Sequence, residues 1–331
     1  MLATRYHRHG GPEVFVCEEV PSPQPGEGEV LVKVEAAGVN YADTVRRHGD
    51  YYPVPTVFPA IPGREVGGKI VALGTGVTGW REGDRIFSTM DDGGYAQFAV
   101  AKQEKLIRAP ANLDLKVGVA LVVQGLTAML VQKDAARLQR EERILIQGAG
   151  GGVGSLSVQL AKLTGAGLVI GVDATEEKRA FVKQQGADMA LNYNDPDWTE
   201  AVMTVTDGKG VDVVQEMTGG QVFTDSLGCL AEFGRLVVYG FASREVNQIE
   251  PNPLLPGNKA IRGFYLERYI DLKRHLVDAA MVELADYVSS GKLTVNIGGI
   301  FGLNQAGETH RLLEEKKSMG KLVILPWGDE Y

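Results

Sequence analysis

Residues 144–173 of this chain, ILIQGAGGGVGSLSVQLAKLTGAGLVIGVD, run from an apolar strand through a cluster of glycines and an apolar-periodic helix to a second strand that ends in Asp173. Glycines at such a turn let backbone amides approach a phosphate, and they let the helix pack closely on the sheet with the anion at its N-terminus. Asp173 follows Gly154 by 19 residues (173 − 154), close to the spacing of about 20 for an acid that binds a ribose. The segment therefore predicts a βαβ unit that binds a dinucleotide, although Ala149 stands where the G-x-G-x-x-G pattern has its first glycine. The residues expected to hold the pyrophosphate are Gly151, Gly152, Val153 and Gly154.

The composition narrows the class of protein. With 331 residues, 44% hydrophobic and 23% charged, the chain is long enough for two domains with their own cores. A net charge of −8 argues against a broad surface for nucleic acid or anionic membrane. Cys17 and Cys229 are too few for a disulfide framework or a four-cysteine zinc lobe. We find no apolar N-terminal leader and no apolar run of membrane-spanning length, so we expect a cytoplasmic protein.

The pattern of elements changes along the chain. Residues 1–122 contain short strands broken by glycine and proline, which predicts a small, partly open barrel. Residues 123–260 then alternate strands and helices, and a segment 261–331 is expected to supply the last strand and return to the first domain. The six strands expected in a doubly wound parallel sheet are RILIQG, GLVIGV, ADMALNY, VDVVQEM, RLVVYG and AIRGFYL.

Motifs along almost the whole chain resemble the medium-chain dehydrogenase/reductase superfamily, in its zeta-crystallin-like quinone oxidoreductase branch. The resemblance implies a GroES-like catalytic domain beside a Rossmann-type domain, and a reductase that uses NAD(P)H. The motifs are GVNYADTVRRHGDYY (38–52), IPGREVGGKIVALGTGV (61–77), QGLTAM (124–129), AGGGVG (149–154), EEKRAFVKQQGAD (176–188), GRLVVYGFAS (234–243) and GKLVILP (320–326).

The zinc ligands of the superfamily's alcohol dehydrogenases are replaced. Asn40 stands in place of a cysteine and Arg64 in place of a histidine, and Glu65 alone cannot hold tetrahedral zinc. The five histidines, His7, His9, His48, His275 and His310, show no ligand spacing and are expected on the surface. Because a conjugated carbonyl needs only hydrogen-bond donors to accept hydride, the resemblance implies a zinc-independent reductase.

Two residues are candidates for stabilising the oxyanion of such a substrate. The amide of Asn40 can donate to a carbonyl oxygen, and the phenol of Tyr51 can donate to the developing negative charge. Alternatively, Asn40 only fixes a turn, and Tyr51 or Tyr52 only packs. We expect Asp43 to hold the loop rather than to titrate in catalysis.

The resemblance also implies the remaining cofactor contacts. These are Asn40, Thr127, Gly240, Phe241, Phe264 and Lys321. At the adenosine ribose, Asp173 favours NADH because it would repel a 2′-phosphate, whereas Lys178 and Tyr193 match positions that bind this phosphate in NADPH-dependent relatives. We therefore expect NADP(H) to be preferred by a small margin, with NAD(H) also accepted.

The sequence thus predicts a reductase of quinones or α,β-unsaturated carbonyl compounds. An enoyl-thioester reductase of lipid or polyketide metabolism, and a non-catalytic crystallin or RNA-binding protein, remain alternatives. We expect a homodimer formed through the apolar edge strand near residues 260–266, because an exposed strand edge favours pairing.

Overall fold

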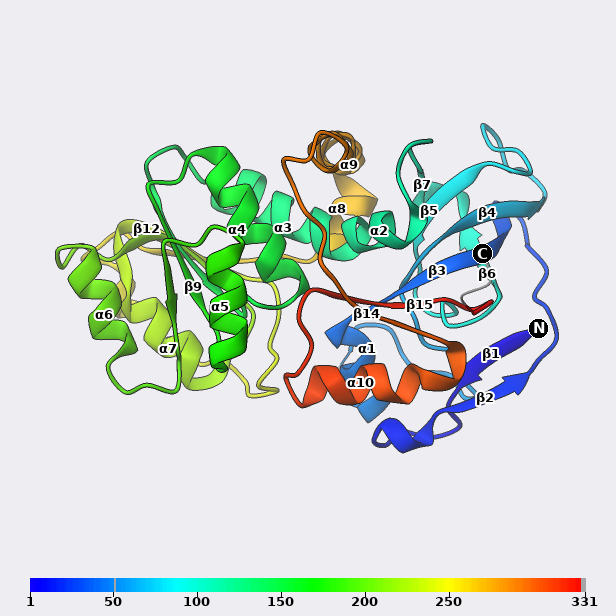
Figure 1. Cartoon of the computed structure of the whole chain (residues 1–331), viewed down its shortest axis with the longest axis horizontal. Helices are drawn as coiled ribbons and strands as arrows, with labels where there is room; N and C mark the ends of the chain where they lie inside the picture. Colours follow the sequence, from blue (N-terminus) through cyan, green and yellow to red (C-terminus); the bar gives the residue numbers. More distant parts are fainter. Residues whose placement is uncertain (51, 329–331) are drawn as a thin grey trace. The chain divides into compact units, whose positions relative to one another are not determined.

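The computed structural model describes residues 1–50 and 52–328 (Figure 1). The chain forms two compact units, the first made of Met1–Val123 with Val295–Tyr331 and the second of Gln124–Thr294. The sequence predicted that segment 261–331 supplies the last strand of the parallel sheet and then returns to the first domain; in the structure the first unit resumes at Val295. Helices α8 (Leu266–Leu272) and α9 (Arg274–Ser289) stay in the second unit, because α9 packs its buried side chains against α3 (Leu126–Leu130).

The first unit is built on a seven-stranded sheet in which β3 is the longest strand. The sheet order is β14-β15-β3-β4-β5-β7, and β6 also pairs with β3. Every pair is antiparallel except β14 with β15. Its strands are β3 (Glu29–Val39), β4 (Glu65–Leu73), β5 (Arg85–Thr89), β6 (Phe98–Lys102), β7 (Leu106–Arg108), β14 (Ile297–Phe301) and β15 (Lys321–Ile324). Strands β1 (Leu2–Arg5) and β2 (Val16–Glu19) form a separate two-stranded antiparallel sheet.

Three α-helices accompany this sheet, and two of them come from opposite ends of the sequence. The helices are α1 (Tyr41–His48), α2 (Leu115–Ala120) and α10 (Ala306–Glu314), with single 3₁₀ turns η1 (Pro12–Val14), η2 (Gln103–Lys105) and η6 (Leu303–Gln305). Helix α10 packs against α1, and β15 pairs with β3 (Figure 1). The C-terminal segment therefore meets the start of α1, where Asn40 lies.

The second unit contains the predicted six-stranded parallel sheet. Its order, β10-β9-β8-β11-β12-β13, is 3-2-1-4-5-6 counted along the chain, which is the arrangement of dinucleotide-binding folds. The strands are β8 (Arg143–Gln147), β9 (Leu168–Val172), β10 (Met189–Leu191), β11 (Val211–Glu216), β12 (Leu230–Val238) and β13 (Ala260–Gly263). The connecting helices are α4 (Gly152–Thr164), α5 (Glu176–Gln184), α6 (Trp198–Val205) and α7 (Gly220–Gly228), and η5 (Asn252–Leu254) is a 3₁₀ turn.

One helical segment corrects an expectation from the sequence. Leu115–Ala136, made of α2, the π-helical turn η3 (Leu121–Gly125), α3 and the π-helical η4 (Val131–Ala136), is 22 residues long with a mean hydropathy of 1.6, as apolar as a membrane span. In the folded chain 83% of its apolar window is buried. Its apolar side chains therefore belong to the protein core.

Candidate functional site

The glycine-rich loop between β8 and α4 has no space for side chains. A Cβ atom on Gly154 would lie 2.3 Å from the Gly148 carbonyl oxygen, and one on Gly152 would lie 2.0 Å from Gln124 Oε1. Helix α4 begins at Gly152, so its first backbone N–H groups point out of this loop at the carboxyl edge of the sheet. Bare backbone at a helix N-terminus is what a pyrophosphate binds, so the loop fits a dinucleotide.

Ala149, the departure from the glycine pattern, is accommodated by another glycine. Ala149 is fully buried, and its amide donates to Val172 O in the adjacent strand. A Cβ on Gly171 would lie only 2.9 Å from Cβ of Ala149. The missing side chain at position 171 therefore makes room for the methyl group at position 149, and the loop keeps its close approach to the sheet.

Asp173 lies beside this loop and binds it. Its Oδ2 accepts from the Gly150 amide at 2.9 Å, its Oδ1 accepts from the Ala174 amide at 2.8 Å, and the residue is 5% exposed. The ammonium of Lys178 is 4.0 Å away. The carboxylate therefore holds the glycine-rich loop through the Gly150 amide and its own turn through the Ala174 amide, a role that the sequence did not indicate.

The other cofactor candidates of the second unit occupy different environments. Thr127 is buried in α3. Gly240 and Phe241 follow the end of β12, and Phe241 is 44% exposed, whereas Phe264 is buried with its ring 4.7 Å from that of Tyr269. Tyr193 packs its partly buried ring against the core of this unit. Phe241 therefore has the side chain most available to a ligand at the carboxyl edge of the sheet.

Two buried polar residues near this edge were missed by the sequence analysis. Glu216, at the end of β11, accepts from the amides of Thr218 and Gly219 through Oε1, and burial raises the pKa of its carboxyl group. Burial also raises the pKa of the Tyr239 phenol, and Glu216 adds to this shift. Neither Glu216 nor Tyr239 stands out in the sequence, because single polar residues at strand ends are common.

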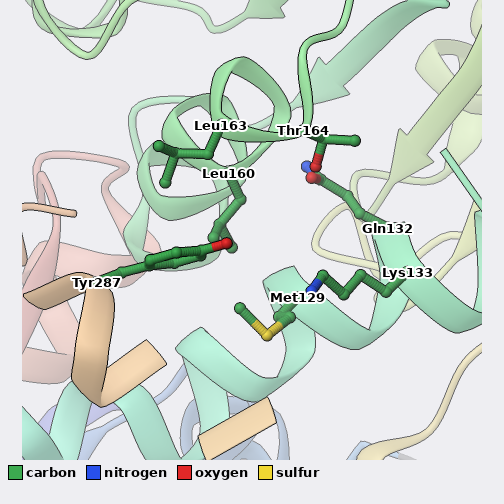
Figure 2. A pocket seen from close by; sticks show the side chains of 7 residues that line it. All are labelled: Met129, Gln132, Lys133, Leu160, Leu163, Thr164 and Tyr287. Atoms are coloured by element: carbon green, nitrogen blue, oxygen red, sulfur yellow. The ribbon is translucent and has the colours of Figure 1, made fainter. Parts of the chain in front are cut away.

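The second unit also has a small pocket away from the glycine-rich loop (Figure 2). Its cavity volume beside the C-terminal half of α4 is about 10 Å³, room for about one water molecule. Its lining residues are Met129, Gln132, Lys133, Leu160, Leu163, Thr164 and Tyr287. Because α4 starts at the loop and rises about 1.5 Å per residue, the pocket lies about a dozen ångströms or more along the helix from the loop. The two features are separate.

In the first unit, a buried polar cluster surrounds Asn40 at the junction of β3 and α1. Three residues of this cluster are buried: Asn40 is 7% exposed, Glu65 0% and Lys321 1%. Asn40 Nδ2 donates to Glu65 Oε1 at 2.7 Å, and the Lys321 ammonium donates to the same oxygen. Glu65 Oε2 accepts from the Val123 amide at 2.8 Å. One amide, one carboxylate and one ammonium are therefore in direct contact in a buried cluster.

A chain of buried hydrogen bonds leads from Asn40 into the interior of the same unit. The Asp43 carboxylate accepts from the backbone N–H of Asn40 at 2.9 Å and from the Tyr95 hydroxyl at 3.1 Å. Burial raises the pKa of the Asp43 carboxyl to about 6. These contacts agree with the expectation that Asp43 holds the loop, since its side chain is fully used within the protein.

His310 continues this chain and corrects the expectation of surface histidines. It is fully buried, with Nε2 at 3.3 Å from the Tyr95 hydroxyl and Nδ1 at 3.5 Å from an Arg47 nitrogen. Burial, with a contribution from Arg47, holds the pKa of His310 well below its usual range. Arg47 also donates to Glu314, which ties α1 to α10.

The neighbourhood of Arg64 is aromatic and cationic. The Arg64 guanidinium lies 5.1 Å from the centre of the Tyr52 ring, and that of Arg46 lies 5.6 Å from it. Arg46 is bound to Asp92 at 2.5 Å and to Pro55 O at 3.0 Å. Tyr51, the second predicted catalytic residue, lies outside the described residues.

The residues around Asn40 do not fit a zinc ion. Of the three functional groups in the cluster only the Glu65 carboxylate is a good zinc ligand, and the Lys321 ammonium already binds it. Residues 1–50 and 52–328 contain no group of three or more His, Cys, Asp or Glu side chains that could hold a metal ion.

A two-unit chain with a 3-2-1-4-5-6 sheet, a bare glycine loop and a separate sheet unit is the architecture of a nicotinamide-dependent dehydrogenase or reductase. Comparison with known families agrees. The pattern of the family described as "Zinc-binding dehydrogenase" matches residues 152–282, and that described as "Alcohol dehydrogenase GroES-like domain" matches residues 26–111.

Relatives match over nearly the full chain. A 2-haloacrylate reductase of Burkholderia sp is 34% identical over 98% of this chain and 99% of its own. A quinone oxidoreductase of Sus scrofa is 32% identical over 98% of both. The structure of Escherichia coli quinone oxidoreductase in complex with NADPH has a TM-score of 0.92 and 29% identity, covering 98% of this chain and 100% of the other. This chain belongs to the medium-chain dehydrogenase/reductase superfamily, in its quinone oxidoreductase branch, and is an oxidoreductase.

Proposed function

We propose that this protein is an NADPH-preferring, zinc-independent reductase that transfers hydride to quinones or other α,β-unsaturated carbonyl compounds. The observation that carries the proposal is the donor set around Asn40. Glu65 accepts a hydrogen bond from one N–H of the Asn40 side-chain amide. Neither Glu65 nor Lys321 binds the second N–H. An amide N–H is sufficient to stabilise a delocalised enolate, whereas a simple ketone or alcohol calls for a Lewis acid.

The second unit supplies the cofactor site in this proposal. When bound, NADPH supplies the hydride. The loop from Gly151 to Gly154 and the N-terminus of α4 bind the pyrophosphate, and Phe241 is available at the carboxyl edge of the sheet. The residues of this chain orient the reactants and exclude water, and the proton that completes the reduction comes from Tyr51 or from solvent.

The preference for NADPH rests on how Asp173 is used. Its carboxylate already accepts two backbone N–H groups, and the Lys178 ammonium is 4.0 Å away. These contacts reduce, but do not remove, the repulsion that a 2′-phosphate would meet there. The structures of relatives that are titled as complexes with NADPH favour the same cofactor. We propose a preference for NADPH of less than about a hundredfold over NADH.

We further propose a homodimer and a cytoplasmic location. Strand β13 is at the end of the parallel sheet, and Ala260, Arg262 and Gly263 are exposed along it. Phe233 and Leu255, 72% and 73% exposed, add apolar surface in the same unit. An exposed strand edge with apolar surroundings favours pairing with a second copy. Cell fractionation with an antibody against the chain would test the location.

A substrate panel tests the proposed activity. Purified protein should be assayed with NADPH and with NADH against 1,4-benzoquinone, 2-cyclohexenone, 2-chloroacrylate and crotonyl-CoA. We expect turnover of the quinone or the enone, with NADPH the better cofactor. A preference for the CoA thioester by a factor of about a hundred would make the chain an enoyl-thioester reductase. No turnover of any of these compounds would favour a non-catalytic role.

A further inference from the structure

The Lys321 side chain uses all of its hydrogen-bond donors inside the protein. Its ammonium donates to Val39 O at 3.1 Å, to Asn40 Oδ1 at 3.1 Å and to Glu65 Oε1. An ammonium group has three N–H donors, so these contacts account for every one. The residue is also only 1% exposed. This geometry leaves no donor with which Lys321 could bind a cofactor directly.

The same contacts determine which way the Asn40 amide faces. Its oxygen lies against the Lys321 ammonium at 3.1 Å, and its nitrogen lies against the Glu65 carboxylate at 2.7 Å. A flipped amide would place its NH₂ group against the ammonium and its oxygen against the carboxylate, so both contacts would become repulsive. The opposite charges of Lys321 and Glu65 therefore fix the direction of the second Asn40 N–H.

We propose that Lys321 is a positioning residue that, with Glu65, orients the Asn40 amide toward the substrate carbonyl. The Lys321 ammonium is a fixed positive charge within the buried cluster. It does not contact the reacting atoms, and its effect passes through Asn40. This inference rests on the proposed reductase function, in which Asn40 donates to the oxyanion.

The backbone around the cluster is shaped to hold this arrangement. A Cβ on Gly38 would lie 2.2 Å from Glu65 Oε1 and 2.7 Å from Glu65 Cδ. Pairing of Leu322 with Val39 in β15 and β3 places Lys321 beside the end of β3. A side chain at position 38 would push the carboxylate away from both of its partners, so the glycine provides the space that the ion pair occupies.

A double-mutant cycle tests the proposal. The variants are Lys321→Met, Asn40→Ala and the double variant, with Lys317→Met as a matched control, because Lys317 is exposed in the same C-terminal segment. We expect Lys321→Met and Asn40→Ala each to lower kcat with 2-cyclohexenone by about a hundredfold, the effect of losing one oxyanion donor. The double variant should be no worse than either single one, and Lys321→Met should change the Kd for NADPH, measured by fluorescence, less than threefold. Lys317→Met should behave as the wild type does.

Two results would overturn the proposal. If Lys321→Met weakens NADPH binding tenfold or more while kcat is retained, Lys321 acts on the cofactor. If the losses of the two single variants multiply in the double variant, Lys321 acts independently of Asn40.

The effect of Lys321→Met on folding must be distinguished from its effect on the orientation of Asn40. Removing Lys321 leaves the Glu65 carboxylate buried without its partner, which can destabilise the fold. The variant Glu65→Gln/Lys321→Met removes both charges together. If Lys321→Met does not fold, the proposal predicts that this neutral pair folds, binds NADPH and still shows the loss in kcat. Normal kcat in the neutral pair would contradict it.

The proposal can also be tested if the reductase assignment itself fails. In ¹⁵N-labelled protein the Asn40 side-chain amide, assigned by its loss in Asn40→Ala, should give two widely separated proton signals because only one N–H binds a carboxylate. Lys321→Met should bring these signals together. Unchanged signals would refute the positioning role, whatever the wild-type protein reduces.

Discussion

Titration of the buried Asp43 carboxyl group should affect the stability of the protein. Burial raises its pKa from 3.8 to about 6, so the folded state binds a proton at a higher pH than the unfolded state does. The free energy of unfolding should therefore fall as pH rises from about 4 to about 6, by about 3 kcal/mol for a shift of about two units. Urea denaturation at intervals between pH 4 and 7 should show this contribution as the difference between the wild type and Asp43→Asn, because His310, whose pKa is held well below its usual range, contributes in the opposite direction.

Asp92 provides the control for that experiment, because desolvation also raises its pKa to about 6. Asp92→Asn should remove only part of the pH dependence and leave the contribution of Asp43 in place. If the pH dependence of the free energy of unfolding is unchanged in Asp43→Asn and lost in Asp92→Asn, Asp43 does not titrate in this range.

Asp173 tests cofactor choice, and two substitutions separate its charge from its contacts. Asp173→Asn removes the negative charge but keeps an oxygen that can accept from the Gly150 backbone amide. Asp173→Ser removes both the charge and this contact, because the serine side chain is shorter. We expect each variant to shift the ratio of kcat/KM for NADPH over NADH upward by about tenfold, since a like charge beside the 2′-phosphate costs on the order of 1–2 kcal/mol. Asp173→Ser should in addition raise KM for both cofactors. If neither substitution changes the ratio, Asp173 does not face the ribose.

The sequence identified the residues with recognisable chemistry but not their partners. Asn40, Glu65 and Asp173 were noticed because of their positions in motifs. The partner that fixes Asn40, Lys321, is 281 positions away, and Arg47 reaches His310 across 263 positions. Spacing along the chain says nothing about such pairs, because the pairing of β15 with β3 and the packing of α10 on α1 bring them together only in the folded state.

Among the elements, the loop leading into α4 has no room for added atoms at Gly154. A Cβ on Gly154 would meet backbone atoms of Gly148 and Ala149 at 2.3 and 2.5 Å, and backbone cannot move aside as a side chain can. We expect Gly154→Ala to raise the Kd for NADPH tenfold or more and to lower the free energy of unfolding by about 1–3 kcal/mol. Gly228→Ala is the matched control, because it lies in α7 with no atom within 4 Å of the added Cβ. Equal effects of the two substitutions would mean that the loop is not close-packed.

The strands of the second unit could be predicted because each is a short apolar run between turn residues. All six appear in the structure, in the 3-2-1-4-5-6 order. The placement of α8 and α9 could not be predicted, since amphipathic helices carry no mark of which unit they cover. The length of Leu115–Ala136 was missed because two π-helical turns join its α-helical pieces into one 22-residue segment.

For the whole molecule, oligomeric state is the property that the exposed edge of the parallel sheet should determine. We expect light scattering at micromolar concentration to give the mass of a dimer. Leu255→Glu, at a position 73% exposed in the second unit, should shift the protein to monomer by placing charge in the apolar contact. Val282→Glu introduces the same charge at a position 72% exposed on α9 and should leave the dimer intact. A wild-type protein that is monomeric at all concentrations would exclude the dimer.

Hydride transfer without a metal is the central claim about the whole protein, and a single-turnover experiment tests it most directly. Protein purified with chelator, with metal content measured by mass spectrometry, would be mixed with NADPH and 2-cyclohexenone or 1,4-benzoquinone while absorbance at the nicotinamide band is recorded. We expect less than about 0.1 zinc per chain, because the donor set at the site already holds an ammonium, and full NADPH oxidation at a rate that added zinc does not change. One tightly bound zinc per chain whose removal abolishes NADPH oxidation would contradict it.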